Sequence, residues 1–75
     1  MMEMWNMNRE IVESSNLKSI GYDPDTKILE IEFHHGGVYQ YFDVPANVHS
    51  GLMSAPSKGS YHYQHIKNEY QYQKI

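Results

Sequence analysis

Tyrosines at alternate positions are the feature that most restricts how this chain can fold. Six of the seven tyrosines stand in three Tyr-x-Tyr pairs, which are Tyr39/Tyr41, Tyr61/Tyr63 and Tyr70/Tyr72. On a β-strand such a pair puts both rings on one face, because side chains alternate with a period of two. Two rings on an exposed face form a stacking platform for a base or a partner protein, whereas two rings on a buried face form part of a core.

The length and composition indicate one small domain. The chain has 75 residues and no cysteine, so neither a disulfide nor a thiolate-bound zinc ion can brace the fold. Residues 1–6 lack the basic stretch and apolar run of a signal peptide, and no apolar segment approaches the roughly 20 residues that a membrane helix needs. We therefore expect a cytoplasmic protein with no membrane partner.

Charge is unevenly distributed along the chain. Residues 1–43 carry eight Asp and Glu against three Lys and Arg, for a net charge of −5, whereas residues 44–75 carry three Lys against one Glu, for a net charge of +2. Strong duplex binders are usually basic overall, so the total of −3 argues against affinity that rests on phosphate contacts alone. The carboxyl-terminal third remains a candidate for a local basic patch.

The first half of the chain predicts an antiparallel meander. Residues 1–10 have no clear period and are expected to form a loose arm, followed by a single domain over residues 11–75. Strand-like patterns occur over residues 11–22, 28–33 and 38–42, and the residues between them favour turns. In the middle strand Leu29, Ile31 and Phe33 alternate with polar residues, which is typical of one buried and one solvated face.

The second half predicts one or two short helices. Pro45 is tolerated in the first turn of a helix, and the spacing of apolar residues predicts a helix over residues 46–54. Ser57 is a candidate N-cap for a second helix over residues 58–68, on which Tyr63 and Ile66 share a face. Residues 70–75 alternate again and suit a final strand. We expect an α+β fold, with a small antiparallel sheet of three to four strands whose core face packs against Val48, Leu52 and Ile66.

The register of the hairpin at residues 35–37 decides what Tyr39 and Tyr41 do. With a two-residue loop, both tyrosines share the outer face with Glu30 and Glu32, whose carboxylates repel phosphate. A three-residue loop instead puts them on the core face. The sequence leaves both registers open.

The order of these patterns resembles the KTSC domain, a module named for the carboxyl terminus of certain lysyl-tRNA synthetases and also found as small stand-alone bacterial proteins. The resemblance covers residues 11–72 and rests on five segments, which are Ser14-Ser15-Asn16; Gly21-Tyr22-Asp23; Leu29-x-Ile31-x-Phe33 followed by Gly36; Tyr39-x-Tyr41 followed by Val44-Pro45; and Ala55-x-Ser57-x-Gly59-x-Tyr61 followed by Ile66 and Tyr70. One departure stands after Tyr61, where the family pattern has an apolar aromatic residue and then Asn, and this chain has His62 and Tyr63.

The resemblance supplies no catalytic residues, because the family has no established activity, and it implies RNA binding only through the association with a tRNA synthetase. No cofactor is expected. The residues themselves point the same way. Tyr61, His62, His65 and Lys67 follow one another on the second predicted helix, with Lys58 at its start, and aromatic and cationic groups of this kind suit a nucleic-acid strand. The alternative is a solvated helix face.

We therefore expect a small non-catalytic binding module whose first-choice ligand is RNA. Its candidate ligand-binding residues are Lys58, Tyr61, His62, His65, Lys67, Tyr39 and Tyr41. The alternative is a protein–protein interaction module with no role in nucleic-acid binding. No metal site is expected, because zinc sites made only of histidine without an ordered third ligand are rare. Ser14, Ser15 and Ser57 lack the flanking glycines of a nucleophile elbow, so no enzyme is expected.

Overall fold

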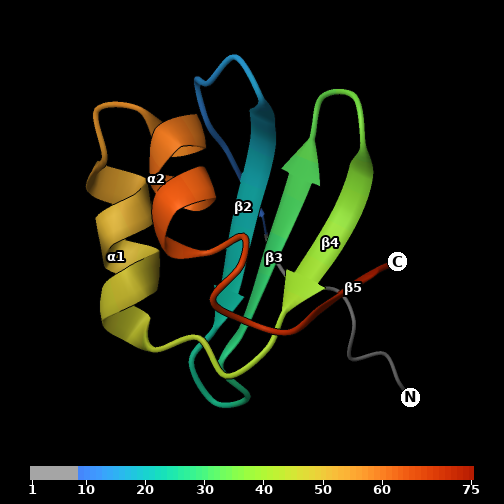
Figure 1. Ribbon diagram of the computed structural model, residues 1–75, viewed down its shortest axis with the longest axis vertical. Coiled ribbons are helices and arrows are strands. Elements are labelled where there is room, and N and C mark those ends of the chain that lie inside the picture. Colours follow the sequence, from blue (N-terminus) through green and yellow to red (C-terminus); the bar gives the residue numbers. More distant parts are fainter. Residues whose placement is uncertain (1–8) are drawn as a thin grey trace.

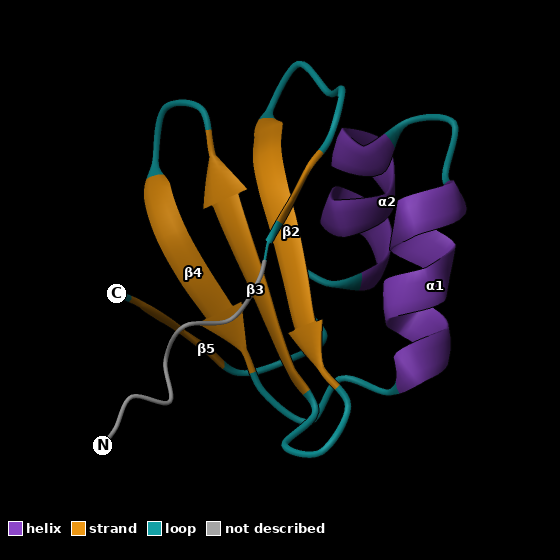
Figure 2. Ribbon diagram, turned by 180° about the vertical axis from the view of Figure 1, so that it is seen from behind, coloured by secondary structure: helices purple, strands orange, loops and turns teal. Residues whose placement is uncertain are grey.

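The computed structural model describes residues 9–75, which form a five-stranded antiparallel sheet and two helices (Figure 1). The strands are β1 (Glu10–Ile11), β2 (Leu17–Asp23), β3 (Ile28–Phe33), β4 (Gly37–Tyr41) and β5 (Tyr72–Lys74). The helices are α1 (Ala46–Ser54) and α2 (Lys58–His65). The strands lie in the sheet in chain order. Both helices lie on the β2 side of the sheet, and the chain then crosses back to place β5 beside β4 (Figures 1 and 2).

The predicted α+β class and the meander are confirmed. The third strand and the first helix have the bounds that their apolar spacing predicts. The sheet has five strands and not the expected three or four, because the predicted first strand is two strands. The segment over residues 11–22 divides into β1 and β2, and residues 12–16 link the two strands with a bend at Ser15 and Asn16. β1, with two residues, is too short to show an alternating pattern in the sequence.

One hydrophobic core lies between the sheet and the helices. Its buried members are Leu17, Ile20, Leu29, Ile31, Tyr41, Val44, Leu52 and Ile66. Five of them come from one face of β2, β3 and β4, and a shift in the β2–β3 register between Leu17 and Ser19 brings Leu17 and Ile20 to that same face. Leu52 and Ile66 come from the helical half of the chain. Val48 and Phe33 are half-buried against this cluster. The sheet face and the helices therefore meet through the residues that the apolar pattern selects.

The β3–β4 register puts the first tyrosine pair on the core face. Phe33 pairs with Gly37, and Leu29 pairs with Tyr41, so the hairpin loop has three residues, 34–36. Gly37 has a φ of 86°, a left-handed conformation that glycine adopts without steric cost. Tyr41 is 4% exposed and Tyr39 is half-buried. The longer of the two possible loops is therefore the one present.

The opposite face of the sheet carries a buried polar network. Glu30 is 3% exposed and Gln40 is 3% exposed, and the Gln40 side chain donates a hydrogen bond of 3.0 Å to the Glu30 carboxylate. The Arg9 guanidinium forms an ion pair with the same carboxylate. The polar groups on this face are buried with partners, which removes most of the cost of taking them from water.

The arm expected over residues 1–10 lies mostly outside the described residues. Of its last two residues, Arg9 contacts Glu30 and Glu10 begins β1, where it pairs with Ile20. The ordered sheet therefore starts before residue 11.

The second helix differs from its predicted form in length and in orientation. Ser57 caps it as expected, since its hydroxyl accepts a hydrogen bond from the Ser60 amide, but the helix ends at His65 and residues 66–69 form turns. The face predicted to point inward was wrong in one residue. His62 and Ile66 are buried, whereas Tyr63 is 65% exposed. Spacings of three and four residues both share a helix face, and the four-residue pair is the one that packs.

Within residues 9–75, no helix is long and apolar enough to cross a membrane.

Candidate aromatic cleft

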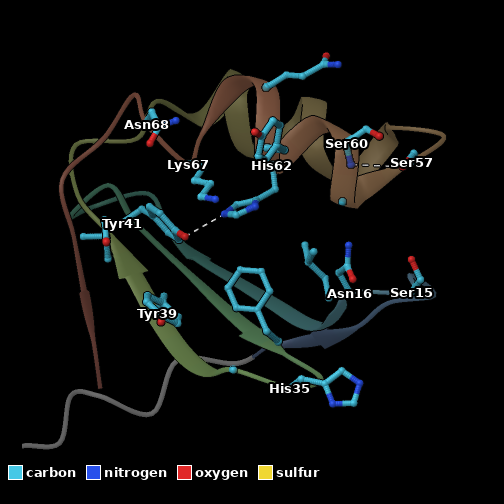
Figure 3. Close-up of a pocket in the computed structure, with 17 residues that line it drawn as sticks. Ser15, Asn16, His35, Tyr39, Tyr41, Ser57, Ser60, His62, Lys67 and Asn68 are labelled. Atoms are coloured by element: carbon cyan, nitrogen blue, oxygen red, sulfur yellow. Dashed lines mark hydrogen bonds between the residues drawn. The ribbon is translucent and has the colours of Figure 1, made fainter.

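A cleft of about 760 Å³ opens between α2 and the core face of the sheet (Figure 3). It is lined by Ser15, Asn16, Leu17, Phe33, His35, Gly36, Tyr39, Tyr41, Ser57, Gly59, Ser60, His62, Tyr63, Gln64, Lys67, Asn68 and Tyr72. Residues of α2 line one side of the cleft, and residues of β2, β3, β4 and β5 line the other. No Asp or Glu of the described chain belongs to this lining.

Five aromatic side chains of the lining contact one another in a closed sequence. Phe33 meets Tyr39 edge to face at a ring-centroid distance of 5.6 Å. Tyr72 lies 5.6 Å from Tyr39 and 5.6 Å from Tyr41. His62 completes the sequence, at 5.6 Å from Tyr41 and 5.1 Å from Phe33. Such tilted and edge-on contacts each add to the stability that burial provides. We refer to these five side chains as the aromatic cluster.

The aromatic cluster runs from a buried end to an exposed end. Tyr41 is 4% exposed and His62 is 9% exposed, whereas Phe33 and Tyr39 are half-buried and Tyr72 is 56% exposed. Tyr72 reaches this place because β5 pairs with β4 in the register that sets Tyr72 beside Tyr41. The exposed end therefore offers ring surface that an incoming flat group can stack on.

A hydrogen bond joins the two buried members. The Tyr41 Oη atom lies 2.9 Å from Nε2 of His62 (Figure 3). Burial raises the pKa of Tyr41 to about 12, and Tyr39 and Tyr72 contribute to the rise. Burial also lowers the pKa of His62, and the charge of Lys67 lowers it further. At neutral pH the cleft floor is therefore an uncharged phenol paired with an uncharged imidazole.

The rim carries the positive charge of the cleft. The Lys67 ammonium lies 5.0 Å from the centre of the exposed Tyr63 ring, a distance typical of a cation–π contact. On the opposite side, Asn16 lies close to the first turn of α2, since a Cβ atom at Gly59 would stand 3.1 Å from the Asn16 amide nitrogen. Side-chain amides and one cation thus border an aromatic floor.

The structure gathers four of the seven candidate residues in this cleft. Tyr39, Tyr41, His62 and Lys67 belong to the lining. Lys58, Tyr61 and His65 lie outside it. The rings of Tyr61 and His65 contact each other at a tilt of 45°, with centroids 4.6 Å apart, and Tyr61 packs against Gly51 of α1. A helix divides its residues among several faces, so neighbours in the sequence do not share one surface.

Sequence reasoning missed several residues of the lining. Asn16 was interpreted as part of a bend, and Tyr72 as part of a strand with no known partner. Phe33 was assigned to the core alone. The Tyr70-x-Tyr72 pair was the available signal, but only the β4–β5 register shows that Tyr72 stands opposite Tyr41.

The histidines do not assemble a metal centre in the described part of the chain. Residues 9–75 contain no group of three or more His, Asp or Glu side chains close enough to hold a metal ion.

Comparison with known proteins agrees with the resemblance seen in the sequence. The family model of the KTSC domain matches residues 13–70 of the sequence. The chain belongs to the KTSC domain family. An uncharacterized protein of Stutzerimonas stutzeri is 43% identical over 70 residues, which cover 92% of this chain and 99% of that protein. Because this relative is uncharacterized, it assigns no activity to the present chain.

A lysine–tRNA ligase of Nostoc sp. contains a similar segment. It is 41% identical over 63 residues, which cover 84% of this KTSC domain but 11% of the ligase. The chain thus spans about a tenth of the length of that relative.

The crystal structure of a KTSC domain protein from Yersinia pestis has the same fold. It superposes with a TM-score of 0.91 at 48% sequence identity, over 92% of this chain and 97% of that one. The sheet and helices described above are therefore those of the family.

Proposed function

We propose that this KTSC domain is a non-catalytic module that binds single-stranded RNA in the cleft between α2 and the sheet. The observation that carries the proposal is an aromatic floor with no carboxylate of residues 9–75 in its lining. In this proposal, the rings stack on bases while the polar and cationic rim meets the backbone and the base edges.

The aromatic cluster supports binding of unpaired bases. Stacking of one base on an aromatic side chain contributes about 1–3 kcal/mol, and it requires bases that are not already paired in a duplex. Tyr72 and Tyr39 present accessible ring surface at the open end of the cleft, and a volume of about 760 Å³ is within the usual range of small-molecule sites.

The charge pattern supports an anionic ligand. The argument against phosphate at the first tyrosine pair assumed that Glu30 and Glu32 share its face. Glu30 is instead buried on the opposite face, where it pairs with Arg9. Lys67 stands at the cleft rim and disfavours a cationic ligand such as a methylated lysine, although aromatic cages often bind such groups.

The occurrence of a similar segment in a lysine–tRNA ligase supports RNA as the class of nucleic acid. That ligase acts on a tRNA by its name.

The test is an amide NMR titration with short single-stranded RNA at low and high salt. We expect shifts clustered on the residues of the cleft and an affinity that falls as salt rises. A spectrum that stays unmoved at millimolar RNA contradicts the proposal and favours the protein-interaction alternative.

A pair of lysine variants locates the phosphate contact. Lys67→Gln should lower the slope of log affinity against log salt by about 0.7, the value for one phosphate contact to a single strand. Lys27→Gln makes the same charge change in the turn between β2 and β3 and should leave the slope unaltered. Equal slopes for the two variants would remove Lys67 from the site.

A tyrosine variant tests stacking. Tyr72→Ala removes a side chain that is 56% exposed, so the fold should survive, and RNA affinity should fall about fivefold or more. Ile75→Ala, on an exposed residue of the same segment, is the matched control.

A further inference from the structure

The buried Tyr41–His62 pair holds more hydrogen-bond donors than it uses. A neutral phenol carries one O–H and a neutral imidazole carries one N–H, which makes two donors. The contact between Oη and Nε2 uses one of them. No other hydrogen bond within residues 9–75 involves the His62 ring, which is 9% exposed. One donor of the pair is therefore left over at the floor of the cleft.

Acidity and basicity decide which donor is left over. The imidazole nitrogen is much the stronger base and the phenol O–H the stronger acid of the neutral pair, so the Tyr41 O–H donates to Nε2. The second ring nitrogen, Nδ1, must then carry the proton of the neutral ring. A buried N–H that lacks an acceptor is unfavourable, so an acceptor brought by a ligand is favoured at this point.

A ligand that places an amino group at this point is disfavoured. If a ligand presents an amino group to Nδ1–H, two donors face each other, and neither finds an acceptor. Uracil and guanine carry a keto oxygen where cytosine and adenine carry an amino group, so this single contact separates the bases into two classes.

We propose that the cleft binds keto bases, uracil and guanine, in preference to amino bases, with Nδ1–H of His62 donating to the keto oxygen. This inference rests on the proposed RNA-binding function. Tyr41 acts as a positioning residue, because its hydroxyl fixes which nitrogen of His62 bears the proton.

The test uses the native protein and five-nucleotide RNAs with a single central base flanked by abasic sites. Uracil against cytosine compares two pyrimidines, and hypoxanthine against adenine compares two purines, so stacking area is matched within each pair. We expect about tenfold tighter binding of the keto member of each pair. The ratio should persist at high salt while both affinities fall, because salt screens the phosphate contacts and not this hydrogen bond.

Tyr41→Phe separates this contact from stacking. Without the phenol, the His62 ring can carry its proton on either nitrogen and can face either class of base. The ratio of the affinity for keto bases to that for amino bases should therefore fall toward one, while stacking persists. Tyr70→Phe, the same chemical change at a half-buried tyrosine outside the cleft lining, should keep the preference. His62→Gln serves if Tyr41→Phe does not fold, since its amide can also present either a donor or an acceptor.

Each outcome has a distinct meaning. Equal affinity for all four bases, or a preference for the amino bases, overturns the keto inference and leaves RNA binding standing. A keto preference that survives in Tyr41→Phe overturns the role of the pair. Absence of binding by every RNA, together with unmoved cleft amides, ends the proposed function and this inference with it.

Discussion

The Tyr41 hydroxyl lies 2.9 Å from Nε2 of His62, which makes one buried polar contact between the fourth strand and the second helix. The contact ties the sheet to α2 at the floor of the cleft. Losing it would leave a ring nitrogen without a partner in a low-dielectric site.

Tyr41→Phe should therefore lower the free energy of unfolding by about 1–2 kcal/mol, because it leaves the buried Nε2 of His62 without its donor. Tyr39→Phe is the matched control, since no hydrogen bond of its hydroxyl occurs within the described residues. Urea denaturation of both variants measures the difference. Equal stabilities would show that the contact contributes nothing net.

Stability should fall as the pH drops from about 7 to 5. Burial lowers the pKa of His62 and that of His49, for which Glu10 offsets part of the effect. Below the unfolded value of about 6.5, the unfolded chain binds more protons than the folded one, and the loss continues until the pH passes the lower folded pKa. Each histidine contributes at most about 1.4 kcal/mol per pH unit.

Substitution identifies the histidine responsible. His62→Gln should reduce the dependence of unfolding free energy on pH and leave the part due to His49, as measured by urea midpoints at several pH values. His65→Gln, at an exposed position of the same helix, should retain the native slope. If the His62→Gln protein keeps the native slope, the loss of stability at low pH comes from other groups.

Gly51→Ala should destabilise the protein although alanine favours helix by about 1 kcal/mol. A Cβ atom at this position would stand 2.7 Å from Cζ of Tyr61, so the two helices must move apart or the ring must turn. Overpacking of this kind costs about 1–3 kcal/mol.

A double-mutant cycle isolates that clash. In a Tyr61→Ala background the added methyl group meets no ring, so Gly51→Ala should there be neutral or stabilising. Thermal unfolding of the four proteins gives the coupling energy. Additive effects would place the cost of Gly51→Ala in the helix itself and not at the interface.

Arg9→Met should destabilise the protein by on the order of 2–3 kcal/mol. It leaves the Glu30 carboxylate, which has a side chain 4% exposed, without its cation on the outer face of the sheet. The loss is smaller than for a fully buried pair because the Arg9 side chain is 30% exposed. Adding Glu30→Gln should restore part of the stability, since the uncompensated charge disappears, and chemical denaturation of the single and double variants measures both effects.

Much of the fold followed from the sequence because it depends on local patterns. Alternation in Leu29-x-Ile31-x-Phe33 defines a strand with one buried face, and the helix over residues 46–54 follows from the spacing of Val48 and Leu52. Ser57 marks the start of α2, because a side-chain acceptor satisfies a free amide in the first turn. These signals act within a few residues and do not require knowledge of distant partners.

The cleft depended on contacts between segments far apart in the chain. Tyr-x-Tyr established that Tyr39 and Tyr41 share a face, but the three-residue loop at 34–36 decided which face, since a shift of one residue in register exchanges the two sides of a strand. Likewise, spacing allowed either Tyr63 or His62 to accompany Ile66 inward, and packing against Tyr41 and Phe33 selected His62. By itself the sequence determined the elements and the residues available for a site, while only the tertiary structure decided which of them meet, because register and helix rotation follow from the packing of the whole core.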